Sequence, residues 1–77
     1  IRPALSFDAV ADELRSVLES GMLTNGPHLA RFETALAAAV GAPHAVATTS
    51  ATTAIHLALA AAGIGPGDEV LVSDFTF

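Results

Sequence analysis

Residues 44–59 read HAVATTSATTAIHLAL, and this stretch decides the fold that the sequence predicts. Its first part, 44–48, is short and apolar, as in a buried strand, whereas its last part has Ala and Leu at helical spacing. A cluster of small hydroxyl residues lies between the two parts. We therefore predict a strand, a tight turn, and a helix from about 52 to 62 that Gly63 closes.

The turn between this strand and this helix is a candidate anion site. The first N–H groups of a helix have no partner within the helix, and the helix dipole favours negative charge beside them. Thr49, Ser50, Thr52 and Thr53 bring hydroxyl groups to the turn, and Ala51 leaves room for a ligand to reach the backbone. Two interpretations remain open, because Ser and Thr also cap helices where no ligand binds.

A second apolar segment, 69–72, follows a turn of the form Gly-Pro-Gly-Asp. Strand, helix and strand in this order form a βαβ unit of a parallel sheet with a right-handed crossover, so we expect an α/β fold. Ligands of open α/β sheets bind outside the carboxyl ends of the strands. The loops 48–53 and 73–77 leave such ends, and Phe75 and Phe77 offer rings that either stack on a planar ligand or pack in a core.

Two helices are predicted ahead of the βαβ unit. The first is capped by Ser6 and ends at Gly21, and the second begins at Pro27 and ends at Gly41. The loop between these helices is either a plain connection or, because Gly26 lacks a side chain, a place where a ligand approaches the backbone closely.

The composition restricts the classes of protein to which the chain can belong. It is 52% hydrophobic and only 14% charged, so we expect that a larger polypeptide covers part of its surface. A net charge of −5 with no lysine argues against a nucleic-acid partner. No apolar run is long enough to cross a bilayer, so a cytoplasmic setting without membrane contact is expected. Three separate histidines and no cysteine predict no metal site.

Four sequence blocks occur in a specific order. They are GP at 26–27 with FE at 32–33, TSATTAIHLAL at 49–59, GIGPGDEV at 63–70, and FTF at 75–77. In these blocks the chain resembles the N-terminal part of the DegT/DnrJ/StrS family, pyridoxal 5'-phosphate (PLP) aminotransferases of fold type I. The resemblance implies that 1–77 is an N-terminal part of the PLP-binding large domain. Residues 1–43 would supply helices, and 44–77 would supply the first βαβ unit of the sheet with the loop for the cofactor phosphate.

The resemblance also implies roles for individual residues. Ala51 and Thr52 would contact the cofactor phosphate, with Ser50 and Thr53 as further phosphate or capping groups. Phe77 would stack on the pyridine ring of the cofactor. Three loop residues would lie near the sugar substrate: Thr24, Asn25 and Gly26.

By resemblance, the activity is transfer of an amino group from glutamate to a nucleotide-linked keto-sugar by a homodimer. The Schiff-base lysine and the carboxylate partner of the ring nitrogen lie downstream in that family, and this chain contains no lysine. We therefore expect no catalytic residue in the chain and no transamination by it alone. The alternatives are a PLP-dependent sugar dehydratase or another fold type I enzyme, and a truncated product without catalytic activity.

Overall fold

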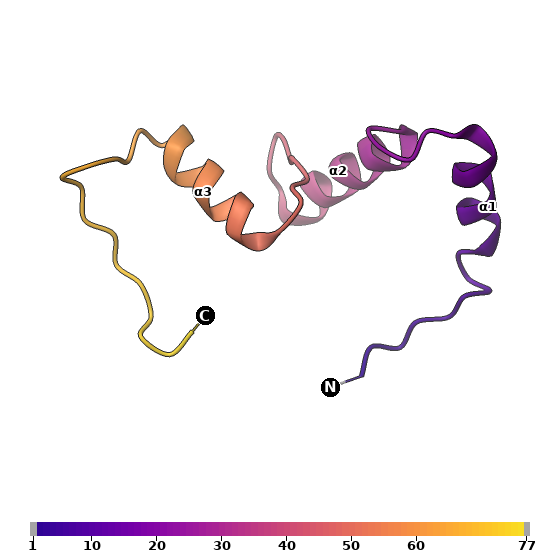
Figure 1. Ribbon diagram of the computed structural model, residues 1–77, viewed down its shortest axis with the longest axis horizontal. Helices are drawn as coiled ribbons and strands as arrows, with labels where there is room; N and C mark the ends of the chain where they lie inside the picture. Colours follow the sequence, from indigo (N-terminus) through magenta and orange to yellow (C-terminus); the bar gives the residue numbers. More distant parts are fainter. Residues whose placement is uncertain (1, 77) are drawn as a thin grey trace. The chain divides into compact units, whose positions relative to one another are not determined.

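The computed structural model describes residues 2–76, and this part of the chain forms three α-helices (Figure 1). The chain divides into two compact units, Ile1–Val46 and Ala47–Phe77. No helix in residues 2–76 is long and apolar enough to cross a membrane. The first unit contains two of the helices and the second unit contains one: α1 (Ala11–Ser20), α2 (Pro27–Val40) and α3 (Ala51–Ala61).

Glycines end the first two helices at the predicted positions. Gly21 has φ 71° and Gly41 has φ 70°, a left-handed conformation that strains residues with a Cβ atom. After α2, the N–H of Ala42 donates to the carbonyl of Ala37 over 2.9 Å, which satisfies one of the free carbonyls at the helix end. Pro27 occupies the first position of α2, as predicted.

The predicted start of the first helix at Ser6 is wrong. A separate turn comes first, in which the N–H of Val10 donates to the carbonyl of Phe7 over 3.0 Å. Val10 is then the N-cap of α1, and no side chain caps the helix. This later start places the acidic pair at 12–13 in the first helical turn, where the helix dipole favours negative charge.

The predicted βαβ unit is not confirmed. Segments 44–48 and 69–72 have no strand assignment, and the trace that follows α3 runs as irregular chain (Figure 1). A parallel strand forms its backbone hydrogen bonds only with neighbouring strands of the sheet, and those strands come from parts of the chain that are distant in sequence. Leu71 and Val72 are 101% and 82% exposed, so nothing in residues 2–76 covers these apolar side chains.

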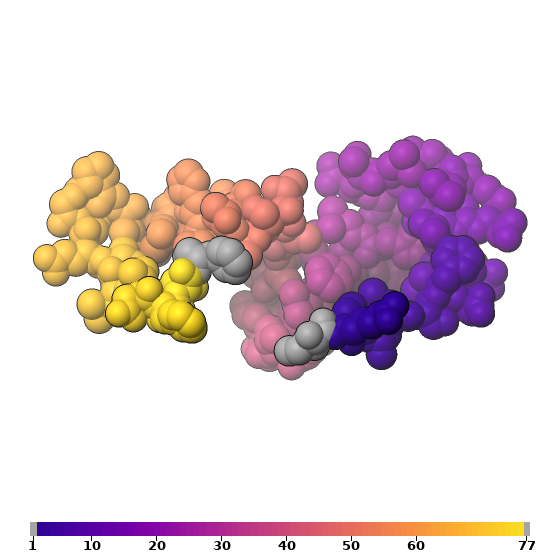
Figure 2. All heavy atoms as spheres, turned by 60° about the horizontal axis from the view of Figure 1, so that its bottom comes forward, coloured from indigo at the N-terminus to yellow at the C-terminus, as the bar shows by residue number. Residues whose placement is uncertain are grey.

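Residues 2–76 have almost no interior of their own. Ala37 is the one buried apolar residue among residues 2–76, with 8% of its surface exposed. No Cα atom of α1 lies within 8 Å of a Cα atom of α2. Large apolar side chains are exposed in both units, which Figure 2 draws with all their heavy atoms. Those on the helices include Leu14, Leu18, Phe32, Leu36, Ile55 and Leu57.

A side chain of the turn fixes the start of α3. Ser50 has an extended backbone, and its Oγ accepts a hydrogen bond from the N–H of Thr53 over 3.1 Å. Its carbonyl accepts from the N–H of Ala54 over 3.0 Å. This is the N-cap arrangement that the hydroxyl cluster predicted, and α3 begins one residue earlier than expected, at Ala51.

We expect the 77-residue chain by itself to lose its helices gradually on heating. Burial of apolar surface is the main favourable term in folding, and Ala37 is the one buried apolar residue among residues 2–76. Far-ultraviolet circular dichroism should show a broad change, and the exposed apolar side chains should bind the dye ANS in native buffer. A sharp transition with equal calorimetric and van't Hoff enthalpies would contradict this prediction.

We also expect Ser50→Ala to lower the helix content of 51–61. The variant removes the acceptor of the Thr53 N–H, a loss of about 1 kcal/mol in helix stability. Cα chemical shifts of α3 measure the effect, and Ser50→Asp is the matched control because aspartate also caps helices. Equal shifts in Ser50→Ala and the wild-type chain would show that the cap does not hold the helix.

Candidate functional site

The hydroxyl groups at the start of α3 bond mainly to one another. Thr48 Oγ1 donates to the carbonyl oxygen of Ser50 over 2.9 Å. Ser50 Oγ and Thr53 Oγ1 lie 2.9 Å apart, and Thr53 Oγ1 lies 3.4 Å from Thr49 Oγ1. The turn is therefore held by contacts between residues no more than four positions apart.

Three donors at the same place remain without a partner in the described residues. They are the N–H groups of Ala51 and Thr52 and the hydroxyl of Thr52, and both residues are exposed. The next two N–H groups, of Thr53 and Ala54, are already used by Ser50. Within the first turn of this 11-residue helix, the free N–H groups are therefore those of Ala51 and Thr52, at the positive end of the helix.

The linked hydroxyls of Thr49, Ser50 and Thr53 can supply one further proton. Three hydroxyl groups carry three protons, and the two contacts between them use two. The third proton is free for an outside acceptor whichever way the two bonds run. The chain therefore offers donors from both backbone and side chains, which suits a ligand whose oxygens only accept.

The electrostatics of this turn also suit an anion. The first turn of α3 contains no acidic residue, so no carboxylate opposes the positive end of the helix. A phosphate group, with several acceptor oxygens and negative charge, fits these donors. The position predicted to stack on the cofactor ring, Phe77, lies outside the described residues.

The loop before α2 adopts a specific conformation at two of its three predicted residues. Asn25 has φ 53°, in the left-handed region that asparagine enters more readily than most residues. Gly26 follows as the N-cap of α2. A Cβ atom at Gly26 would lie 3.1 Å from the carbonyl oxygen of Met22, a tight contact that favours glycine there.

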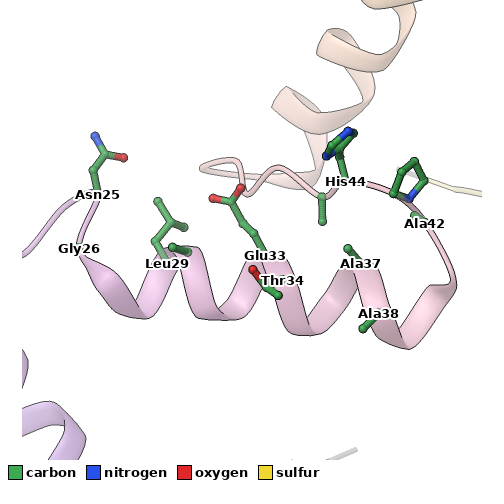
Figure 3. Close-up of a pocket in the computed structure, with 12 residues that line it drawn as sticks. Asn25, Gly26, Leu29, Glu33, Thr34, Ala37, Ala38, Ala42 and His44 are labelled. Carbon is green, nitrogen blue, oxygen red and sulfur yellow. The ribbon is translucent and has the colours of Figure 1, made fainter.

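A groove of about 550 Å³ lies along α2 (Figure 3). Asn25 and Gly26 line one end of the groove, whereas Thr24 is not among the residues that line it. Glu33 and His44 also line it, and Figure 3 shows Glu33 projecting from α2 on the side where His44 lies. The groove therefore combines an apolar helix face with amide, carboxylate and imidazole groups at its edges.

Glu33 and His44 were not predicted as site residues. Glu33 lies two helical turns after Gly26 and so faces the same side of α2, a spacing that the sequence does contain. His44 reaches the groove only because the chain reverses after Gly41, and residue spacing does not predict the path of that reversal. Residues 2–76 hold no group of three or more His, Asp or Glu side chains that could bind a metal ion.

Comparison with known proteins identifies the family. The family described as the DegT/DnrJ/EryC1/StrS aminotransferase family matches residues 7–77. The Spore coat polysaccharide biosynthesis protein SpsC of Bacillus subtilis is 57% identical over 65 residues, 84% of this chain and 17% of that protein. The UDP-4-amino-4-deoxy-L-arabinose--oxoglutarate aminotransferase of Shewanella sediminis is 46% identical over 79 aligned positions, 99% of this chain and 19% of that protein.

No solved structure gives a significant match to the chain. The chain spans less than a fifth of the length of the two relatives, and the family match covers residues 7–77, which include the turn at α3 and the loop before α2. The chain belongs to the DegT/DnrJ/EryC1/StrS aminotransferase family.

Proposed function

We propose that this chain is the part of a PLP-dependent sugar aminotransferase that binds the phosphate of the cofactor. The observation that carries the proposal is the start of α3, where Ala51 and Thr52 have free N–H groups, Thr52 has a free hydroxyl, and no carboxylate lies in the first turn. Family membership implies the fold type I architecture and the use of PLP. In this proposal, residues 1–77 belong to the large domain of the enzyme.

Each residue of the turn has a distinct role in this proposal. The N–H groups of Ala51 and Thr52 and the Thr52 hydroxyl donate to phosphate oxygens, while Ser50 holds the helix start in place. PLP, when bound, supplies an electron sink for chemistry at the carbon that bears the amino group. Phe77 is proposed, from the family resemblance, to stack on the cofactor ring. The Schiff-base lysine must come from outside these 77 residues, because the chain contains none.

We propose that the substrate is a nucleotide-linked keto-sugar and that glutamate is the amino donor. The name of one relative gives a UDP-linked amino-sugar and oxoglutarate, and oxoglutarate is the keto acid that remains when glutamate gives up its amino group. Thr24, Asn25 and Gly26 are the proposed contacts to the sugar. The proposed enzyme is a cytoplasmic homodimer, with no nucleic-acid or membrane partner.

We further propose that segments 44–48 and 69–72 become parallel strands when the rest of the large domain is present. Their side chains support this, because Val46 is 78% exposed and Leu71 is 101% exposed. Apolar residues of this kind gain about 25 cal/mol per Å² when a sheet and its covering layer bury them. Residues 1–43 would then pack as helices at the edge of that domain.

Thr52→Ala in the full-length enzyme is expected to weaken PLP binding by about tenfold to a hundredfold. A hydrogen bond to a charged group contributes roughly 1.5–3 kcal/mol, and the variant removes one donor to the phosphate. Titration of the apoenzyme with PLP, followed by absorbance, measures the dissociation constant.

The matched controls for this prediction are Thr52→Ser, which keeps the hydroxyl, and Thr49→Ala, whose hydroxyl already contacts Thr53. Both should retain PLP more tightly than Thr52→Ala does. Equal affinity of Thr52→Ala and the wild-type enzyme would argue against a phosphate contact at this hydroxyl.

The full-length enzyme, loaded with PLP, is expected to convert a UDP-linked 4-keto-sugar to the amino-sugar in the presence of glutamate. The amount of oxoglutarate released, measured by a coupled dehydrogenase, should equal the amount of amino-sugar formed. Each amino group that the sugar gains comes from one glutamate, which becomes oxoglutarate. Loss of water from the sugar without oxoglutarate release would instead identify a dehydratase.

A further inference from the structure

We infer that Asn25 is a site of spontaneous deamidation, which converts the neutral amide at the end of the groove into a carboxylate. Asn25 is the one asparagine of the chain, and glycine follows it directly. The Asn-Gly pair lies in the loop before α2, at the edge of the groove (Figure 3). The modification needs only water, so it is independent of the proposed enzymatic activity.

The reaction is a ring closure followed by hydrolysis. The backbone nitrogen of Gly26 attacks Cγ of Asn25, the new N–Cγ bond replaces the Cγ–Nδ2 bond, and ammonia leaves with the former amide proton. Water then opens the resulting succinimide at either carbonyl and leaves aspartate or isoaspartate. One water enters and one ammonia departs, and nothing is oxidised or reduced.

Three features of the loop favour this ring closure. Asn25 is exposed, and Figure 3 shows its amide projecting away from α2. The N–H of Gly26 donates no hydrogen bond within the described residues, so closure breaks none. Gly26 also has no side chain to hinder the attack. The carbonyl oxygen of Gly26 accepts a hydrogen bond from the N–H of Leu29, and this bond does not involve the attacking nitrogen.

The surroundings of Asn25 favour the charged product. The first turn of α2 holds no acidic residue, so a carboxylate at position 25 is attracted by the positive end of that helix. Isoaspartate also adds a methylene group to the backbone ahead of Gly26, where the carbonyl oxygen of Met22 leaves little room. The modification therefore changes both the charge and the shape of the groove at its Asn25 end.

The test is incubation of the full-length enzyme in ¹⁸O-labelled water at mildly alkaline pH, followed by peptide mass spectrometry. The label should enter position 25 at a rate within about tenfold of that in the same protein unfolded in urea, because Asn25 is exposed and the Gly26 N–H donates no hydrogen bond within residues 2–76. Slower labelling of the native enzyme would overturn the inference, because it would mean that the folded protein shields the Asn25–Gly26 pair.

Asn25→Gln is the matched control. Its longer side chain keeps a neutral amide but must close a six-membered ring, so the peptide should acquire no label at position 25 in the same time. Ion-exchange chromatography gives a second reading, because deamidated wild-type protein gains one negative charge and the variant does not. Label uptake at position 25 in Asn25→Gln at the wild-type rate would contradict the succinimide route.

Discussion

The hydrogen bond from the Thr53 N–H to Ser50 Oγ determines what the start of α3 can bind. A helix N-terminus always has several free N–H groups, and an N-cap side chain removes some of them from use. Here Ser50 uses the N–H groups of Thr53 and Ala54 and leaves those of Ala51 and Thr52. The cap therefore does not compete with an anion. It sets the direction of the first helical turn and leaves the N–H groups of Ala51 and Thr52 as the free ones of that turn.

The rest of the chain has few contacts to stabilise it. The helix ends are fixed locally, by Gly21, Gly41 and Ser50, but Ala37 is the one buried apolar residue in 2–76. Isolated helices of this length are marginal in water, because packing of an apolar face supplies most helical stability in proteins. The apolar faces of α1, α2 and α3 thus gain their main stabilisation only when further protein covers them.

Local signals were predicted well from the sequence, and non-local ones were not. Gly21, Gly41 and Pro27 act through their own backbone conformation, so their positions were confirmed. Ser6 failed as a cap because a turn closed by Phe7 and Val10 precedes α1. The strands predicted at 44–48 and 69–72 were not confirmed, and a parallel strand needs partner strands that the periodicity within one segment does not supply.

The same distinction applies to the candidate sites. The residue types at 50–53 indicated either an anion site or a plain helix cap, but only the structure shows that Thr52 keeps a free hydroxyl while Ser50 and Thr53 contact each other. The groove edge at His44 depends on the reversal of the chain after Gly41, which spacing alone does not predict. Phe77 lies outside the described residues, so its stacking role stays a prediction.

The local character of the turn at α3 has a consequence for how the proposed enzyme would acquire its cofactor. Every hydrogen bond that shapes the turn joins residues at most four positions apart, so the donors proposed to bind the phosphate are in place without the proposed sheet. If phosphate binds the ordered turn and not the unfolded chain, its binding stabilises the folded state by mass action. Strand formation at 44–48 extends the same chain segment into the turn, so the sheet and the phosphate would stabilise each other. The site would then be preorganised by hydrogen bonds within the turn and stabilised further by contacts with the rest of the proposed sheet.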